Sequence, residues 1–198
     1  MIVLVTGGAS SGKSALAEQI ALSLAGPHVY LATMSGQGEA ARERIARHRA
    51  LRAGKGFETV ERESDLAGLE LPKELRCGTI LVEDVGNLVA NALFASDGLA
   101  AGDGLGGPDG FFTRIAADDA FTRSCAQRLA DDILSLAGQC ANLVVVTNEV
   151  GCDGVRYDDA TRAYLVLLGA VSCSLAEKAN TVCESACGLP IVTKGVRI

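Results

Sequence analysis

The stretch Met1-Ile-Val-Leu-Val-Thr-Gly-Gly-Ala-Ser-Ser-Gly-Lys-Ser-Ala-Leu-Ala-Glu18 decides the fold of this chain. Its apolar run over residues 2–5 predicts a buried strand, and a helical pattern opens at Lys13. Between the two lies Gly7-x-x-x-x-Gly12-Lys13-Ser14, the pattern of a phosphate-binding loop between a strand and the start of a helix. A Gly/Ser-rich turn with an accidental lysine is the alternative, and both flanking elements argue against it.

The residue types of this loop suit a nucleotide. Glycines let the backbone curl so that successive N–H groups point at an anion, and the start of the helix adds its own attraction for phosphate. The Lys13 ammonium can reach the β- and γ-phosphates, and the Ser14 hydroxyl can ligate Mg²⁺. We therefore expect GTP or ATP to contact the whole loop, which comprises Gly7, Gly8, Ala9, Ser10, Ser11, Gly12, Lys13 and Ser14.

Composition limits the remaining possibilities. A length of 198 residues fits one domain, so we predict a single P-loop nucleotide-binding domain over residues 1–198. The net charge of −6 argues against a nucleic-acid partner. No apolar stretch has the length of a signal peptide or a membrane span, and the seven cysteines are scattered without metal-ligand spacing. These features predict a cytoplasmic protein with reduced thiols.

Apolar strand-like runs alternate with helical patterns along the chain, which predicts the α/β class with a mostly parallel sheet. The glycine-rich stretch from residue 96 to residue 111 predicts a flexible loop, within an insert that we extend to residue 118. Besides residues 2–5, strands are predicted at 28–32, 57–60, 79–82, 142–146, 181–183 and 191–193. Helices are predicted at 13–24, 39–52, 85–94, 119–136 and 158–178.

Polar residues follow several of these predicted strands. In a parallel sheet the carboxyl ends of the strands share one edge, where ligands bind. We therefore expect the phosphate-binding loop, Thr33-Met34, Glu83-Asp84 and residues 147–149 to meet in one crevice, with Thr33 and Met34 contacting the nucleotide. Glu83 ends an apolar strand, the position of the carboxylate that holds Mg²⁺ or polarises an attacking hydroxyl. Asp84 competes with Glu83 for this metal-binding role.

The predicted helix over residues 39–52 concentrates five arginines in an otherwise acidic chain. Arg44 and Arg52 lie four residues to either side of His48, so the three share a helix face. Neighbouring positive charge disfavours the protonated form of a histidine. We expect His48 to be a neutral, nucleophilic imidazole among groups that can grip phosphate oxygens. A solvated helix with i,i+4 charge pairs is the alternative.

Taken together, these motifs resemble the family of adenosylcobinamide kinase/adenosylcobinamide-phosphate guanylyltransferases of cobalamin biosynthesis. The matching pieces cover nearly the whole chain. They are Thr6–Ser14 with Ala17-Glu18, Tyr30–Thr33, Arg44–Arg49 with Arg52, Thr59–Glu61, Leu81–Glu83, Asn91, Thr147–Gly151, Gly188–Pro190 and Lys194-Gly195.

The resemblance implies two reactions at one nucleotide site. A γ-phosphate would pass from GTP or ATP to the aminopropanol hydroxyl of adenosylcobinamide, and a histidine would then carry GMP from GTP to the phosphorylated corrinoid. His48 matches that histidine, while Glu61 and the segment from Arg49 to Arg52 match nucleotide-contacting positions. The family further implies a RecA-like P-loop fold and a homotrimer.

The chain also departs from the family's usual pattern. Ser10 stands where the family usually has arginine, and Asp84 and Gly86 stand where it has cysteine and threonine. These departures leave two alternatives open. One is a divergent member with a single activity and no guanylyl transfer, and the other is a P-loop kinase for a different small molecule.

Overall fold

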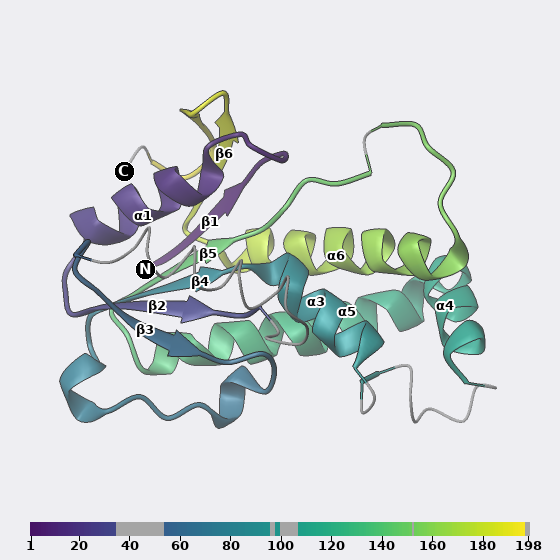
Figure 1. The fold of residues 1–198 in the computed structure, drawn as a ribbon, viewed down its shortest axis with the longest axis horizontal. Coiled ribbons are helices and arrows are strands. Elements are labelled where there is room, and N and C mark those ends of the chain that lie inside the picture. Colours follow the sequence, from purple (N-terminus) through teal and green to yellow (C-terminus); the bar gives the residue numbers. More distant parts are fainter. Residues whose placement is uncertain (35–53, 96–97, 100–106, 152, 197–198) are drawn as a thin grey trace.

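The computed structural model describes residues 1–34, 54–95, 98–99, 107–151 and 153–196 (Figure 1). A seven-stranded sheet in the order β3-β2-β4-β5-β1-β6-β7 forms its centre. The strands are β1 (Ile2–Thr6), β2 (His28–Ala32), β3 (Phe57–Glu61), β4 (Thr79–Glu83), β5 (Asn142–Val146), β6 (Thr181–Ala186) and β7 (Leu189–Lys194). Neighbouring strands are parallel except β6 and β7, which form an antiparallel hairpin. The predicted α/β class with a mostly parallel sheet is confirmed.

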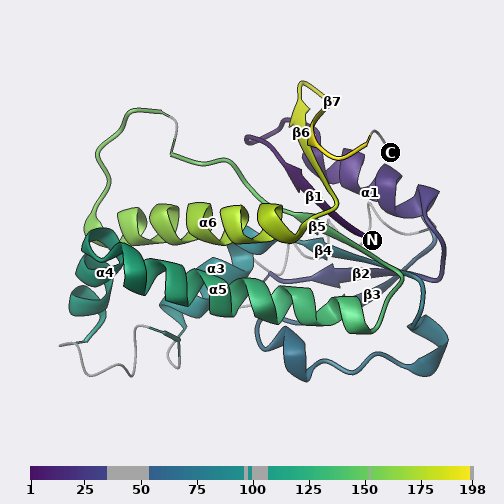
Figure 2. The ribbon, with the colours of Figure 1, turned by 180° about the vertical axis from the view of Figure 1, so that it is seen from behind.

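Helices cover both faces of this sheet (Figures 1 and 2). On one face lies α1 (Lys13–Ser23), and on the other α5 (Asp119–Ser135) and α6 (Asp159–Lys178) run side by side. Two further helices of the described chain, α3 (Val85–Phe94) and α4 (Pro108–Ala117), pack against α6. Short 3₁₀ turns occur at η1 (Leu66–Gly68), η2 (Lys73–Leu75) and η3 (Leu136–Gly138).

Alternation along the central strands separates two hydrophobic cores. In β1, Val3 and Val5 face α1, whereas Leu4 belongs to the larger core beneath α3, α4, α5 and α6. Successive strand side chains point to opposite faces, so strands covered on both sides are apolar throughout. The continuous apolar runs over residues 2–5, 80–82 and 143–146 follow from this arrangement.

The predicted loop over the insert is wrong for residues 108–117, which form α4. Gly107 adopts a positive φ just before the helix, and Pro108 occupies its first turn, where a missing N–H costs nothing. Phe111, Phe112 and Ile115 are buried in the larger core. The preceding glycines favour a loop in the sequence pattern, whereas the contacts that stabilise this helix come from elements distant in the sequence.

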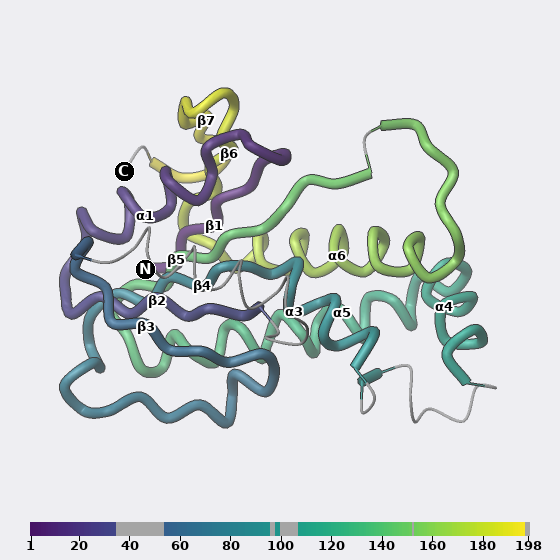
Figure 3. The backbone as a smooth tube through the Cα atoms, in the orientation of Figure 1, coloured from purple at the N-terminus to yellow at the C-terminus, as the bar shows by residue number. Residues whose placement is uncertain are grey.

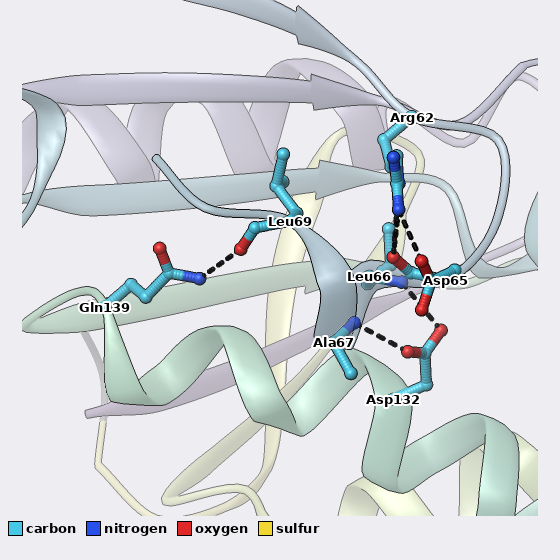
Figure 4. Close-up of polar contacts among 7 residues, drawn as sticks. All are labelled: Arg62, Asp65, Leu66, Ala67, Leu69, Asp132 and Gln139. Atoms are coloured by element: carbon cyan, nitrogen blue, oxygen red, sulfur yellow. Dashed lines mark hydrogen bonds and ion pairs between the residues drawn. The ribbon is translucent and has the colours of Figure 1, made fainter. Parts of the chain in front are cut away.

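The segment between β3 and β4 is held by polar contacts against α5 and against Gln139, which follows η3 (Figure 4). The Asp132 carboxylate accepts hydrogen bonds from the backbone N–H groups of Leu66, at 3.1 Å, and Ala67, at 2.7 Å. The Gln139 side chain accepts a bond from Leu71 N at 2.9 Å and donates one to Leu69 O at 2.6 Å. These contacts fix the segment that leads into β4 and its terminal carboxylate.

Replacing Asp132 by alanine is expected to lower the free energy of unfolding by about 2 kcal/mol, because two backbone donors lose a charged acceptor. Urea denaturation measures the change. Asp131→Ala is the matched control, since the exposed Asp131 side chain contacts Gln127 on the same surface helix. Equal effects of the two substitutions would contradict the proposed anchoring of η1.

No helix in the described part of the chain is long and apolar enough to cross a membrane. The described cysteines are all free thiols. The predicted helix over residues 39–52, with His48, Arg49 and Arg52, lies outside the described residues.

Candidate nucleotide-binding site

The loop between β1 and α1 curls through conformations that favour glycine at its two ends. Gly7 has a φ of 154°, and a Cβ there would lie 2.6 Å from Ser11 Oγ and 2.8 Å from Ser185 O. Gly12, the residue before α1, has a left-handed φ of 88° and offers no side-chain cap to the helix. The first N–H groups of α1 are thus left without a capping side chain, which suits an incoming anion.

The β6–β7 hairpin supports this loop from behind (Figure 3). The Ser11 carbonyl accepts hydrogen bonds from Gly188 N, at 2.7 Å, and from Ser185 Oγ, at 2.8 Å. A Cβ on Gly12 would lie 3.0 Å from Gly188 Cα. On the β5 side, Glu149 N donates to Gly7 O at 3.1 Å. With two of its carbonyls bound to neighbouring segments, the loop is pre-shaped before any ligand arrives.

Lys13, Ser14 and Glu83 meet at the mouth of the loop. Ser14 Oγ donates to Glu83 Oε1 at 2.6 Å, and Lys13 Nζ donates to Gly8 O at 3.1 Å. The other carboxylate oxygen, Glu83 Oε2, is buried and has no hydrogen-bond partner among the described residues. Burying a carboxylate oxygen without a hydrogen-bond partner destabilises the folded state, as is expected of a group that binds a ligand or a metal ion.

Burial raises the pKa of Glu83 from its ordinary value of 4.5 to about 7. The Asp84 and Glu18 carboxylates reinforce this rise, whereas the Ser14 hydrogen bond and the Lys13 charge oppose it. Near neutral pH the side chain is therefore divided between its two protonation states. A cation bound beside it would favour the ionised form.

Asp84 has a different task from Glu83. Its Oδ1 accepts a hydrogen bond from the backbone N–H of Asn87 at 2.8 Å and so caps α3. Its backbone is hydrogen-bonded to the Thr33 hydroxyl. Thr33 Oγ1 accepts from Asp84 N at 2.7 Å and donates to Asp84 O at 2.8 Å. Asn91 Nδ2 in turn donates to Thr33 O at 3.0 Å and to Glu63 O at 2.9 Å. This geometry favours Glu83 over Asp84 as the carboxylate that partners the loop.

A cavity of about 610 Å³ opens at this edge of the sheet. Its walls combine the loop, the ends of β2 and β4, the first turns of α3, the segment after β5 and one side chain of α6. The lining residues are Ser10, Lys13, Ser14, Met34, Glu83, Asp84, Gly86, Asn87, Ala90, Asn148 and Tyr164.

Of the site residues predicted from the sequence, Ser10, Lys13, Ser14, Met34 and Glu83 line this cavity. The other loop residues are not among those that line the cavity, and Thr33 contributes by hydrogen-bonding the backbone of Asp84. Glu61 ends β3 in register with Ala32, which pairs with Glu83 on its other side, so two strand spacings separate the two glutamates. The predicted roles of all these residues stay predictions.

The sequence does not identify Tyr164 as a site residue, and Gly86 stands out in it only as a departure from the family's usual threonine. Tyr164 lies in the second turn of α6, and nothing in its helical spacing distinguishes it from core-facing neighbours. Burial raises the pKa of its hydroxyl, and the negative charge of Asp84 adds to the rise. Only the packing of α6 against α3 brings this side chain to the cavity.

The site offers few protein ligands for a metal ion, as is usual where Mg²⁺ is bound together with phosphate groups. No group of three or more His, Cys, Asp or Glu side chains in the described part of the chain is arranged to hold a metal. One hydroxyl and one carboxylate with a partnerless oxygen are present instead, and Mg²⁺ is commonly bound by one or two such ligands together with substrate phosphates. The residues fit the ion.

A glycine loop between a strand and a helix, its lysine, and a serine hydrogen-bonded to a strand-end carboxylate define a P-loop nucleotide-binding α/β protein. The strand of the loop, β1, and the strand of the carboxylate, β4, are separated by β5.

The chain belongs to the cobinamide kinase/cobinamide phosphate guanyltransferase family, which it matches over residues 3–193. It is 31% identical over 193 residues to the bifunctional adenosylcobalamin biosynthesis protein CobP of Pseudomonas aeruginosa, covering 97% of this chain and 96% of the relative. It is also 31% identical over 198 residues to CobU of Escherichia coli, covering 98% and 100%. The chain is accordingly a transferase of the kinase and nucleotidyltransferase type.

Similar solved structures include the flagellar accessory protein FlaH of Methanocaldococcus jannaschii and a separate ATPase domain. FlaH has a TM-score of 0.45 and 12% identity, covering 98% of this chain and 78% of FlaH. The ATPase domain has a TM-score of 0.41 and 11% identity, covering 92% of this chain and 68% of that one.

Proposed function

We propose that this protein phosphorylates adenosylcobinamide and then transfers GMP to the phosphorylated product, using one nucleotide site for both reactions. The observation that carries the proposal is the contact between Ser14 Oγ and Glu83 Oε1 at the mouth of the glycine loop. It places a hydroxyl, a carboxylate and the Lys13 ammonium around one cavity, in a chain that belongs to this family.

In the kinase step the chain's own groups bind and orient GTP or ATP. Backbone N–H groups of the loop and the start of α1 hold the phosphates, and the Lys13 ammonium moves from Gly8 O to the β- and γ-phosphates. Ser14 and Glu83 would hold Mg²⁺, which neutralises charge that develops on the phosphates. The γ-phosphoryl group passes to the aminopropanol hydroxyl of the corrinoid.

In the guanylyl step, His48 attacks the α-phosphorus of GTP and pyrophosphate leaves. The histidine-bound GMP is then transferred to the phosphate of adenosylcobinamide phosphate. A nucleophilic intermediate divides one difficult transfer into two displacements. Support for this step comes from the position of His48 among arginines and from the family resemblance. Arg49, Arg52 and Glu61 are proposed to contact the nucleotide.

We further propose that the enzyme works in the cytoplasm and assembles as a homotrimer, as the family resemblance implies. The net charge of −6 disfavours a nucleic-acid partner, and the cavity of about 610 Å³ has the size of a small-molecule site, so we propose a corrinoid as the partner.

The test follows two labels into product. GTP labelled in the γ-phosphate is expected to yield labelled adenosylcobinamide phosphate, and GTP labelled in the α-phosphate is expected to yield labelled adenosylcobinamide-GDP. Transfer of the γ-label alone would identify a single-activity member instead. Transfer of neither label to the corrinoid would contradict the proposal, and γ-label found on another alcohol would then favour a kinase for a different small molecule.

A further inference from the structure

A second cavity, of about 450 Å³, lies between the loop that follows β5 and the first two turns of α6. This loop runs beside α6 and leads into its first turn (Figures 1 and 2). Among the described residues, the second cavity shares no lining residue with the nucleotide cavity. We call it the Arg156 cavity, and its lining residues are Gly151, Val155, Arg156, Tyr157, Arg162 and Leu165.

The two guanidinium groups of this cavity are free to bind a ligand. Arg156 forms no ion pair or hydrogen bond with another described residue. Arg162 Nη1 lies 3.9 Å from Asp159 Oδ1, which is too far for a hydrogen bond, and both side chains are exposed. Because an exposed ion pair of this kind contributes little to stability, a ligand can replace it at little cost.

The carboxylates beside the cavity are engaged in local hydrogen bonds instead. Asp153 Oδ1 accepts from Val155 N at 3.1 Å, and Asp153 Oδ2 accepts from the Tyr157 hydroxyl. Asp158 Oδ1 accepts from Thr161 N at 2.7 Å and caps α6. These hydrogen bonds lower the pKa of both carboxyl groups. The acidic residues therefore shape the loop, and the arginines keep their donors for a ligand.

This donor set suits a phosphate monoester. A guanidinium group binds phosphate oxygens through two parallel N–H donors, and two guanidinium groups balance the two negative charges of a phosphate monoester. A carboxylate carries one negative charge and would leave one arginine unpaired. The apolar side chains of Val155 and Leu165 line the same cavity and suit a carbon skeleton next to the phosphate.

The Arg156 cavity adjoins the nucleotide cavity along two elements. Asn148 lines the nucleotide cavity and Gly151 the Arg156 cavity, and three residues span at most about 11 Å. On α6, the adjacent residues Tyr164 and Leu165 line the nucleotide cavity and the Arg156 cavity, respectively. A phosphate group bound by the arginines would therefore lie near the nucleotide without occupying the glycine loop.

We propose that the Arg156 cavity is a second phosphate site, which binds an organic phosphate monoester through Arg156 and Arg162 while the glycine loop holds the nucleotide. The inference rests on the proposed function only for the source of this ligand. The product of the proposed kinase step, adenosylcobinamide phosphate, is a phosphate monoester that the second transfer consumes.

The binding test fills the glycine loop first. Wild type is saturated with Mg²⁺ and a non-hydrolysable GTP analogue, and phenyl phosphate is then titrated by calorimetry. Phenyl phosphate is expected to bind with one equivalent per chain, and benzoate, with one negative charge, at least about tenfold more weakly. Absence of phenyl phosphate binding, or benzoate binding of equal strength, would overturn the proposal.

Arginine variants locate the bound phosphate. Arg156→Gln and Arg162→Gln are each expected to raise the Kd for phenyl phosphate at least about tenfold, because charge-assisted hydrogen bonds are lost. Arg156→Lys, which keeps the charge but loses the planar fork, should give an intermediate Kd. Arg128→Gln is the matched control, since Arg128 is exposed on α5 and the change in charge is the same.

The control should bind phenyl phosphate as wild type does. Equal weakening in Arg128→Gln and the two cavity variants would show unspecific attraction to positive charge and overturn the site. The Kd for the GTP analogue is measured in parallel and should change less than about twofold, because Arg156 and Arg162 lie outside the nucleotide cavity. An equal loss of nucleotide affinity would mean that phosphate binds in the glycine loop, which also overturns the proposal.

A second set of measurements identifies the source of the phosphate. Adenosylcobinamide phosphate is expected to displace phenyl phosphate from wild type. Arg156→Gln should raise its KM in GMP transfer at least about tenfold, with kcat within about twofold and the KM for adenosylcobinamide in the first reaction unchanged. If phenyl phosphate binds and adenosylcobinamide phosphate does not displace it, the site stands and the corrinoid is overturned as its ligand.

The outcomes also separate this inference from the proposed function. If neither the γ-label nor the α-label of GTP reaches the corrinoid, the proposed function fails, and the phenyl phosphate titration still decides the site. If both labels reach the corrinoid and phenyl phosphate does not bind to the nucleotide-saturated protein, the Arg156 cavity alone is overturned.

Discussion

Lys13→Ala is expected to lower kcat/KM for phosphoryl transfer at least about a hundredfold, the usual cost of removing one preorganised charge from a transition state. Among the described residues, Lys13 Nζ donates to the carbonyl of Gly8 and forms no ion pair, so the ammonium can turn toward phosphate at little cost. The substitution should therefore change the free energy of unfolding by no more than about 0.5 kcal/mol.

Steady-state assays with γ-labelled GTP and urea denaturation together check this expectation. Lys73→Ala is the control, because the exposed Lys73 lies on η2, shortly before β4 begins, at the opposite end of that strand from the site. Activity of Lys13→Ala within a few fold of the control would remove Lys13 from the mechanism. A large loss of stability would mean that the activity loss has another cause.

Glu83→Gln is expected to separate activity from stability. Loss of the carboxylate should lower phosphoryl transfer about a hundredfold, since the site loses its one carboxylate hydrogen-bonded to the loop serine. In the protein without nucleotide and metal, however, the same substitution should be stabilising at neutral and alkaline pH. The reason is the buried, partnerless oxygen of Glu83.

The sign of the stability effect follows from the raised pKa of Glu83. The folded state binds the proton with a pKa of about 7, against 4.5 in the unfolded state. This proton contributes stability that is complete below pH 4.5 and is lost as the pH rises through 7. Glutamine does not ionise. The variant should therefore gain about 2 kcal/mol relative to wild type between pH 5 and pH 8.

Urea denaturation of both proteins at several pH values measures this gain. Glu74→Gln is the control, because Glu74 is exposed on η2. The control and wild type should show the same pH dependence. If Glu83→Gln also runs parallel to wild type, the burial of an ionisable Glu83 is not the source of the effect.

Much of the fold could be predicted because its signals are local. The strand, loop and helix over residues 2–24 are specified by adjacent residues, and β2 and β5 have the predicted bounds. Fully buried parallel strands need continuous apolar runs, and such runs are easily read. Helix α4 could not be predicted, because its signals are not local. Glycines precede it, and it is stabilised by the packing of Phe111 and Ile115 in the core that α4 shares with α5 and α6.

The same distinction applies to the candidate site. Lys13, Ser14 and Glu83 could be predicted because a loop motif and a strand-end acid identify them. Their convergence with Asn148 follows from the shared edge of a parallel sheet. The place of Tyr164 in the cavity wall could not be predicted, because it depends on how α6 packs against α3. Nor could the support of the loop by Ser185 and Gly188, which depends on the β6–β7 hairpin.

The choice between Glu83 and Asp84 shows what side-chain geometry adds. Both are carboxylates at the end of an apolar strand, and the sequence does not separate them. One is hydrogen-bonded to Ser14, and the other caps α3 through Asn87 N. Adjacent residues at the end of one strand thus serve the loop and the helix, respectively.

The central claim is that one nucleotide site serves both transfers, and the most direct test is a search for label on the protein itself. GTP labelled in the α-phosphate is expected to leave acid-labile label on wild type and on Lys73→Ala, whereas GTP labelled in the γ-phosphate leaves none. His48→Asn and Lys13→Ala should both remain unlabelled, because the histidine attacks a nucleotide that the glycine loop holds. Label on His48→Asn equal to that on wild type would contradict the histidine intermediate, and full labelling of Lys13→Ala would contradict a single shared site.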